Sequence, residues 1–302
     1  MQYWIYGVSL ISDFSFPFDQ SDREGFTRIS LREWIPHPAG EVGTLSGSQR
    51  LRHLKDGSTH LRWPDLFECL IDAPGREMKV HCLGSSSVDS FYSYLLGQAL
   101  SIALLKQSVE QFHATVLSID GKALALTGDC GRGKSTLAGA LIRHGAKLLV
   151  DDMLVLREEQ GRFIAYPGPA ALKLMPDSAR AFGRSTRTAL RMNALVEKKI
   201  FPVRQAQEDP IVLRHIYALT APSPRTKLTR IRRCSPAQSC IELVAAAYNL
   251  DDSRADRMAR QLDWAAKVSR AVPVSRLSFP RNLGQVDDVA QVLVSSFTRG
   301  ET

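Results

Sequence analysis

The sequence has no run of the roughly 20 consecutive apolar residues that a membrane-spanning helix needs, so no span and no membrane partner are expected. Its first residues contain no basic segment followed by a long apolar core, and we therefore expect no signal peptide. The five cysteines are an odd number and have no C-x-x-C spacing. This usage argues against a disulfide framework or a zinc site and favours a reducing, cytoplasmic location.

The sequence has fewer acidic than basic residues. The 302 residues carry a net charge of +8, and between residues 173 and 233 fourteen Lys and Arg stand against four Asp and Glu. This excess suits an anionic partner such as a nucleotide or an acidic peptide, although a solvated surface explains it equally well. No known nucleic-acid-binding motif is present, so nucleic acid is not expected as a partner. The length allows roughly two domains.

One stretch carries recognisable chemistry. Residues 128–136 fit the pattern G-x-x-x-x-G-K-[ST], after an apolar strand at 123–127 and before a helical pattern with Leu137, Leu141 and Ile142 on one face. A chance match in a glycine-rich turn is disfavoured because the strand, loop, helix and next strand follow in the required order. The predicted nucleotide-binding residues are Gly128, Asp129, Cys130, Gly131, Arg132, Gly133, Lys134, Ser135 and Thr136.

The spacing of this motif has a physical reason. Glycines let the main-chain N–H groups turn inward towards phosphate oxygens, and the helix N-terminus adds its positive dipole end. Lys134 can reach the β- and γ-phosphates, and the Ser135 hydroxyl can ligate Mg²⁺. A second apolar strand ends in Asp151 and Asp152, and a carboxylate at the end of a neighbouring strand can hold the metal or accept a proton. ATP and Mg²⁺ are therefore the predicted cofactors.

The rest of the chain is less specific. Residues 1–108 indicate a β-rich N-terminal domain that ends in a helix at 87–107, and its aromatic residues form either its core or a peptide-binding groove. Residues 109–302 form the predicted nucleotide-binding domain, which opens with a hairpin at Asp120-Gly121 and has His113 at its start. A late helix at 254–271 is predicted to direct Met258, Leu262, Trp264 and Ala265 inward.

Together these residues resemble the HPr serine kinase family. His113 before a hairpin, the phosphate loop, one helix and a strand ending in Asp-Asp follow in the family's order. The similarity is good over about residues 112–156 and weaker but collinear through 167–174, 198–203 and 272–281. Residues 6–12 and 95–97 resemble a narrower branch, the kinases encoded with peptide-modifying enzymes and acting on lasso-peptide precursors.

The resemblance implies an α/β fold, with a P-loop kinase core of the HPr kinase and phosphoenolpyruvate carboxykinase-like type beside the smaller β-rich domain. It gives Asp151 the role of the base that deprotonates the acceptor hydroxyl, His113 a place beside it, and Asp152 with Ser135 the metal. Candidates for binding phosphate or substrate are Lys173, Lys198 and Lys199. Residues 166–173 contain none of the carboxylates that supply a further magnesium ligand in HPr kinases.

The resulting prediction is a Mg-ATP-dependent serine kinase with a ribosomal (lasso) precursor peptide as its favoured acceptor. Two alternatives stay open: a kinase of a free small hydroxyl compound such as serine, and a nucleotide-responsive regulatory protein without phosphate transfer. A nucleoside triphosphate and the acceptor are the expected partners. The sequence leaves open the identity of the acceptor, a phosphorylase activity and a homo-oligomeric state.

Overall fold

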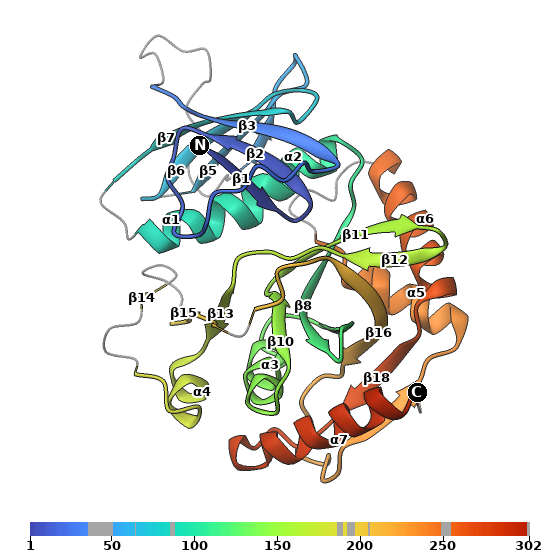
Figure 1. The fold of residues 1–302 in the computed structure, drawn as a ribbon. Helices are drawn as coiled ribbons and strands as arrows, with labels where there is room; N and C mark the ends of the chain where they lie inside the picture. Colours follow the sequence, from blue (N-terminus) through green and yellow to red (C-terminus); the bar gives the residue numbers. More distant parts are fainter. Residues whose placement is uncertain are drawn as a thin grey trace. The chain divides into compact units, whose positions relative to one another are not determined.

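The computed structural model describes residues 1–35, 51–63, 65–84, 88–185, 190–191, 197–204, 206–248 and 255–300. The chain forms two compact units (Figure 1), the first from Met1–Val109 and the second from Glu110 onward, with the two-residue strand β14 (Leu190–Arg191) grouped with the first. This division lies one residue beyond the predicted boundary between residues 108 and 109. No helix in the described ranges is long and apolar enough to cross a membrane.

The first unit contains a mixed sheet of order β1-β2-β3-β7-β6-β5-β4. Its strands are β1 (Gln2–Ile5), β2 (Val8–Ser12), β3 (Thr27–Glu33), β4 (Leu51–His53), β5 (Thr59–Trp63), β6 (Phe67–Ile71) and β7 (Glu77–Cys82). Tyr6 and Phe16 are buried, and Phe16 stacks on Phe18 and meets Tyr3 edge-on. These aromatic residues therefore pack as core, as one of the two interpretations predicted.

The predicted helix of the first unit is interrupted by a wider turn. It runs as α1 (Val88–Tyr94), a π-helical segment η1 (Leu95–Ala99) and α2 (Leu100–Lys106), and Ser87 lies outside the described residues. Leu95, Ile102 and Leu105 are buried, which agrees with the predicted inward face. A π-turn inserts one residue into the helical repeat, so the periodicity of the sequence alone does not reveal it.

The second unit is built on a mixed sheet of order β10-β8-β11-β12-β16-β18-β17, with β9 paired to both β8 and β16. The strands are β8 (Gln111–Ile119), β9 (Lys122–Thr127), β10 (Lys147–Val150), β11 (Met153–Glu159), β12 (Arg162–Ala165), β16 (Ile211–Leu219), β17 (Arg230–Arg233) and β18 (Val274–Ser278). A separate pair joins β13 (Ala171–Leu174) to β15 (Lys199–Pro202). The mixed α/β class is as predicted.

The hairpin β8–β9 forms at the predicted turn, where Asp120 (φ 49°) and Gly121 (φ 71°) both have positive φ. That pair of angles is characteristic of a tight type I′ turn, and Asp-Gly tolerates it. The same signal recurs at Gln160 and Gly161 between β11 and β12. Local turn chemistry therefore fixes both hairpins of this unit.

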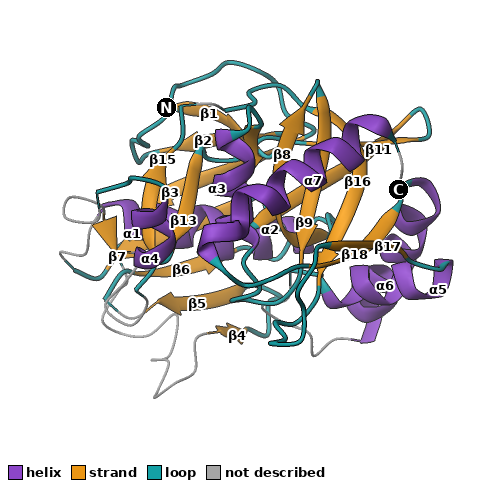
Figure 2. Ribbon diagram, turned by 90° about the horizontal axis from the view of Figure 1, so that it is seen from below, coloured by secondary structure: helices purple, strands orange, loops and turns teal. Residues whose placement is uncertain are grey.

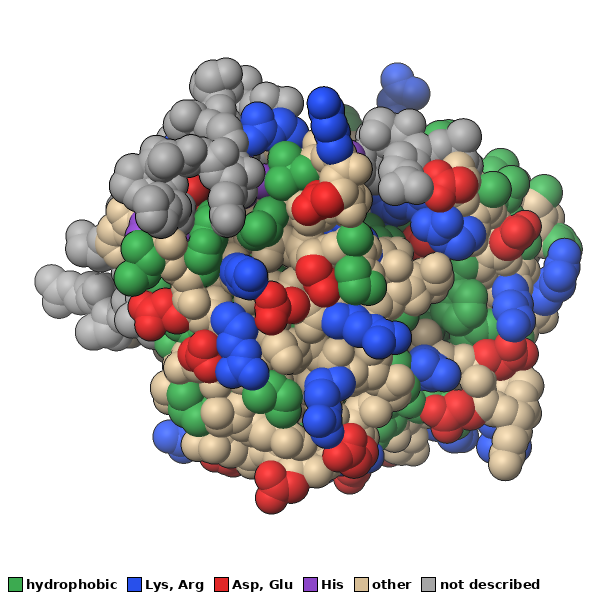
Figure 3. All heavy atoms as spheres, turned by 90° about the horizontal axis from the view of Figure 1, so that it is seen from above, with side chains coloured by type: hydrophobic (Ala, Val, Ile, Leu, Met, Phe, Trp, Pro, Cys, Tyr) green, Lys and Arg blue, Asp and Glu red, His purple; other side chains and the backbone are tan. Residues whose placement is uncertain are grey.

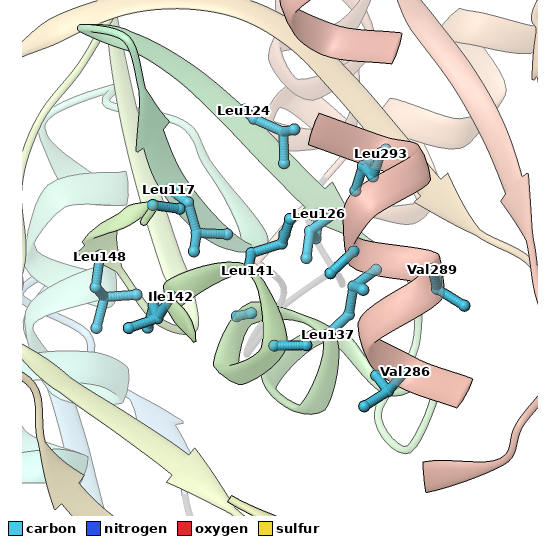
Figure 4. Close-up of a cluster of buried hydrophobic side chains, with 14 of the residues drawn as sticks. Leu117, Leu124, Leu126, Leu137, Leu141, Ile142, Leu148, Val286, Val289 and Leu293 are labelled. Atoms are coloured by element: carbon cyan, nitrogen blue, oxygen red, sulfur yellow. The ribbon is translucent and has the colours of Figure 1, made fainter. Parts of the chain in front are cut away.

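The helices of the second unit are α3 (Lys134–Arg143), α4 (Pro176–Ala181), α5 (Pro236–Ala245), α6 (Ala255–Ala271), the 3₁₀ turn η2 (Leu283–Gln285) and α7 (Val286–Arg299). Figure 2 shows α3 and α7 on one face of the sheet. Leu137, Leu141 and Ile142 of α3 meet β-strand leucines and the inner side of α7 in one buried cluster (Figure 4). Burying each such side chain contributes roughly 1.5–3 kcal/mol, so this cluster holds the helix rigidly behind the phosphate loop.

The inward face of α6 was predicted correctly for Ala265, which is buried, and Trp264, which meets Phe163 edge-on, but wrongly for two other residues. Met258 and Leu262 are 59% and 53% exposed, whereas the polar residues Arg257 and Gln261 are buried. Arg257 donates to the carbonyl oxygen of Tyr248, and Gln261 donates to that of Val244. Carbonyl groups at the end of a helix such as α5 need donors, so polar side chains occupy positions that a hydrophobic pattern assigns to apolar ones.

Charge is distributed without one dominant sign over the face drawn in Figure 3. There Lys and Arg side chains alternate with Asp and Glu side chains, so the net charge of +8 is not gathered into one patch on that face. In the predicted basic segment, Arg230, Arg232 and Arg233 lie on β17, a strand at the edge of the sheet. Charged side chains on an edge strand discourage pairing with other chains, which gives these arginines a structural role.

Candidate active site

The phosphate loop connects the C-terminal end of β9 to α3. Gly128 and Gly133 have φ of 130° and 86°, and Gly133 is the N-cap residue of α3. A Cβ on Gly128 would lie 3.0 Å from the carbonyl oxygen of Leu219. Both positions thus require glycine, and the N–H groups of the first turn of α3 are left free to meet an anion.

Lys134 is folded into this loop. Its Nζ donates to the carbonyl oxygens of Gly128 (2.6 Å) and Asp129 (3.1 Å), and the residue is only 6% exposed. Burial lowers the pKa of Lys134, and Lys198 nearby adds to this, while Asp152 and Asp151 oppose it. The lysine therefore has an ammonium group at the centre of the loop with little competing hydration.

Two arginines, Arg132 of the loop itself and Arg281, tie the loop to the segments at the ends of β16 and β18. Arg132 donates to the carbonyl oxygen of Leu219 (3.0 Å). Arg281, just beyond β18, donates to the carbonyl oxygens of Arg132 and Thr220 and lies 3.8 Å from the centre of the Phe279 ring. Arg281 has no motif around it, and sequence reasoning missed its contact with the phosphate loop.

The Asp-Asp pair reaches the loop through strand directions. β10 is antiparallel to β8, and β8 is antiparallel to β9, so β10 and β9 run the same way and end at the same edge. The prediction placed the strand that ends in the two aspartates next to β9. In the structure that strand, β10, is separated from β9 by β8. Thr115 of β8 fills the gap and donates to Asp151 Oδ1 (2.6 Å).

Asp151 faces the helix side of the phosphate loop. Ser135 Oγ lies 3.4 and 3.5 Å from its two carboxylate oxygens, and the N–H of Lys173 donates to Oδ2 (2.9 Å). Asp151 is 5% exposed, and burial, followed by the charge of Asp152, raises its pKa. A carboxylate with a raised pKa is a better proton acceptor near neutral pH than an ordinary aspartate.

Asp152 adopts a conformation that is rare for residues other than glycine. Its φ of 84° lies at the kink between β10 and β11, which pair in succession with β8. Lys173 Nζ is 2.5 Å from Asp152 Oδ2. Burial opposes the charge on Asp152, but Lys173 and His113 outweigh it and hold the pKa of Asp152 below its usual range. Backbone strain of this kind costs about 1–3 kcal/mol and is often found at functional sites.

His113 lies at the same edge, at the start of β8. Its Nδ1 is 3.1 Å from the carbonyl oxygen of Asp152. A carbonyl oxygen can only accept, so Nδ1 is the protonated nitrogen and Nε2 is free to accept a proton. Burial lowers the pKa of His113, as does the charge of Lys134, while Asp152 opposes this. The neutral imidazole is thus the form favoured at neutral pH.

The remaining predicted residues divide between the site and its surroundings. Lys198 is close enough to lower the pKa of both His113 and Lys134, so it belongs to the site. Lys199 begins β15 opposite Leu174. The Thr136 hydroxyl is 2.9 Å from that of Ser178 in α4 and therefore fixes α4 against α3. Cys130 has an exposed side chain in the loop.

For a magnesium ion the described residues provide oxygen ligands from Ser135 and Asp151, which lie within 3.4 Å of each other. They contain no group of three or more His, Cys, Asp and Glu that could hold a metal ion by themselves. This donor set fits Mg²⁺, because that ion takes one or two protein oxygens and completes its shell with water and substrate phosphates. Asp152, the predicted metal ligand, has Lys173 as its charge partner, and its role towards a metal stays a prediction.

The Lys173–Asp152 ion pair predicts a measurable stability effect. The two side chains are 12% and 19% exposed, so Lys173→Met leaves a largely buried carboxylate without its cation. We expect a loss of roughly 3 kcal/mol in the free energy of unfolding at pH 7, near the lower end for breaking buried pairs. The lowered pKa of Asp152 means that this stabilisation exists above the unfolded pKa of about 3.8 and fades as pH falls below it. Urea unfolding measured from pH 7 down to about pH 2 tests it.

Lys267→Met is the matched control for this prediction. Lys267 also pairs with a carboxylate at 2.5 Å, Glu158, but the side chains are 52% and 34% exposed. Solvent-exposed pairs contribute about 0–1 kcal/mol. Equal losses for the two variants, or a loss in Lys173→Met that does not shrink as pH falls, would contradict the proposed pairing.

A known protein of similar sequence agrees with the geometry of the site. No family model matches the chain. A curated HPr kinase/phosphorylase from Lactobacillus delbrueckii subsp. bulgaricus is 28% identical over 168 residues, which are 55% of this chain. The chain matches about half of that relative's length (51%). The solved structure of the HPr(Ser) kinase/phosphatase from Coxiella burnetii matches with a TM-score of 0.34 and 17% identity, covering 64% of this chain and 99% of that chain.

The sequence similarity confirms the predicted resemblance to the HPr kinase family at its broad level. The narrower resemblance to kinases of lasso-peptide precursors stays a prediction, as do the roles of the individual site residues. Over 168 matched residues the chain is similar to an HPr kinase/phosphorylase.

Proposed function

We propose that the protein is a Mg-ATP-dependent kinase that phosphorylates a serine hydroxyl on a peptide. The observation that carries the proposal is the convergence of the phosphate loop, the buried Asp151 and the neutral His113 at one edge of the sheet. A protein that only binds a nucleotide has no need of a buried carboxylate with a raised pKa beside the phosphate loop.

The phosphate groups would be held by the loop N–H groups, Lys134 and the start of α3. Mg²⁺, when bound with the nucleotide, would neutralise charge on the phosphates, with the Ser135 hydroxyl as its protein ligand. Phosphoryl transfer depends on positioning and charge neutralisation more than on covalent participation of the protein. Lys134 contributes most to this, because its ammonium lies within the loop itself.

In the transfer step the serine Oγ attacks the γ-phosphorus, the bond between that phosphorus and the β,γ-bridging oxygen breaks, and ADP leaves. Asp151 takes the proton of the serine hydroxyl, as its raised pKa favours. Its orientation is fixed by the Thr115 hydroxyl and the Lys173 N–H. His113 lies on the other side of Asp152, where its free Nε2 can hold an acceptor group in place.

The acceptor proposal is a serine in a ribosomal precursor peptide of the lasso type. It rests on the resemblance of residues 6–12 and 95–97 and on the name of the curated relative, an HPr kinase/phosphorylase. Lys198 and Lys199 supply positive charge for an acidic peptide or its phosphorylated product. We place the reaction in the cytoplasm, where ATP and newly made precursor peptides are both present.

Transfer from γ-labelled ATP tests the proposal. The chain is incubated with Mg²⁺ and either a synthetic serine-terminated peptide or free L-serine, and products are read by mass spectrometry. We expect phosphoserine in the peptide and none in free serine, with Lys134→Met as the inactive control. Transfer to free serine alone would support the small-molecule alternative, and ADP binding without any transfer would support the regulatory one.

A further inference from the structure

A pocket of about 160 Å³ opens directly beside the phosphate loop. It lies between the start of α3 and the segment that joins β18 to α7, and its apolar lining includes Leu137, Phe279, Leu283 and Val286. Leu283 is 39% exposed at the 3₁₀ turn, although leucine is usually covered. The pocket is therefore a small apolar space with a rim that a ligand would cover.

Gly133 joins this pocket to the phosphate-binding turn. It is both the N-cap residue of α3 and part of the pocket lining. A Cβ at this position would lie 2.9 Å from Arg281 Nη1 and 3.9 Å from Phe279 Cζ. Gly133 therefore belongs to both the phosphate-binding turn and the pocket lining, so the two sites adjoin at this residue.

The polar groups around the pocket are largely committed elsewhere. Arg281 donates from both terminal nitrogens to main-chain carbonyl oxygens, and Asn282 Oδ1 accepts the N–H of Gly284. The Thr136 hydroxyl is bonded to Ser178. The lining contains no carboxylate. The lining therefore offers apolar contact but no side-chain acceptor aimed at the amino group that distinguishes adenine from guanine.

We propose that this pocket holds the base of the bound nucleotide by apolar contact and does not distinguish adenine from guanine. The inference rests on the proposed function, since the phosphates of the same molecule would lie in the loop at Gly133. A site that reads a polar group by hydrogen bonds rejects the wrong ligand by about 10⁴–10⁵-fold, whereas an apolar site discriminates far less. ATP and GTP would therefore both serve as phosphate donors.

Equilibrium binding of Mg-ADP, Mg-GDP and inorganic tripolyphosphate tests the proposal. We expect the Kd values of ADP and GDP to agree within roughly tenfold, and both nucleotides to bind at least roughly tenfold more tightly than tripolyphosphate. Leu283→Glu places a charge at the rim and is expected to weaken both nucleotides about tenfold while leaving tripolyphosphate binding unchanged. Leu283→Ser, which adds no charge, should weaken both nucleotides in the same direction but less.

Val292→Glu is the matched control, because Val292 is an apolar residue of α7 that is 45% exposed and lies outside the pocket lining. It should leave all three Kd values unchanged. Three results would each overturn the inference without contradicting the phosphate loop. They are tripolyphosphate binding as tight as that of ADP, ADP binding that is unchanged in both Leu283 variants, and a preference for ADP over GDP beyond about 100-fold. Failure of all three ligands to bind would overturn the proposed function itself.

Discussion

Replacing Lys134 with methionine is expected to lower kcat for phosphate transfer by at least about 10²–10³-fold, the cost of losing one charged or hydrogen-bonding group that stabilises the transferring phosphate. Methionine keeps much of the apolar stem and removes only the ammonium. That ammonium lies inside the phosphate-binding turn, where it donates to two of the turn's carbonyl oxygens. Steady-state transfer from labelled ATP measures the loss.

Methionine is a better choice than alanine at this position. Lys134 is 6% exposed and binds two carbonyl oxygens of its own loop, so its side chain is part of the packed structure. Either substitution leaves two carbonyl groups without their donor, but alanine would leave a cavity as well, and both effects cost stability. Thermal unfolding of both variants separates the loss of charge from the loss of structure. Near-normal turnover by a folded Lys134→Met variant would show that the phosphate loop is not the catalytic one.

Local signals predicted the centre of the second unit well. The turn at Asp120-Gly121, the glycines of the phosphate loop and the apolar face of α3 each depend on residues close together in the chain. Glycine at positive φ indicates a turn, and leucine at helical spacing indicates a buried helix face, in almost any structure. The placement of Asp151 and Asp152 after an apolar strand was likewise read from adjacent residues, and β10 ends at Val150.

Long-range partners were not predictable in the same way. Nothing near Lys173 indicates that its N–H and its ammonium each fix a different aspartate 22 or 21 positions earlier. Arg281 braces a loop 149 positions away. The interposition of β8 between β9 and β10 follows from strand pairing, which neither periodicity nor composition encodes. Such contacts depend on the closed sheet, so they could be found only from the structure.

The consequence for mechanism is that the two adjacent aspartates have opposite surroundings. Asp151 has neutral donors and a raised pKa, whereas Asp152 has an ammonium partner and a lowered one. A one-residue step along the chain separates them, but the positive φ of Asp152 turns their carboxylates to different partners. Pairs of acids with pKa values pushed apart are typical of sites that assign them different roles.

Asp151→Asn is the sharpest test of those roles. Removing a general base costs about 10²–10⁴-fold in rate, so we expect kcat to fall by that factor while the Kd of Mg-ADP changes little. A raised carboxyl pKa also means that activity of the wild type is lost as pH falls through a value above the ordinary 3.8. This acid limb should be absent from the residual activity of the variant. Measuring kcat against pH for both proteins shows it.

The free energy of unfolding shows whether a variant has lost a catalytic group or part of its structure. A carboxyl whose folded pKa is raised destabilises the native state once pH exceeds the unfolded value, so neutral asparagine should cause little loss of unfolding free energy at pH 7. Asp152→Asn should behave oppositely, because it removes the partner of Lys173. If Asp151→Asn weakens Mg-ADP binding as much as it lowers kcat, then Asp151 is the principal metal ligand beside Ser135, and the base must be sought at Asp152.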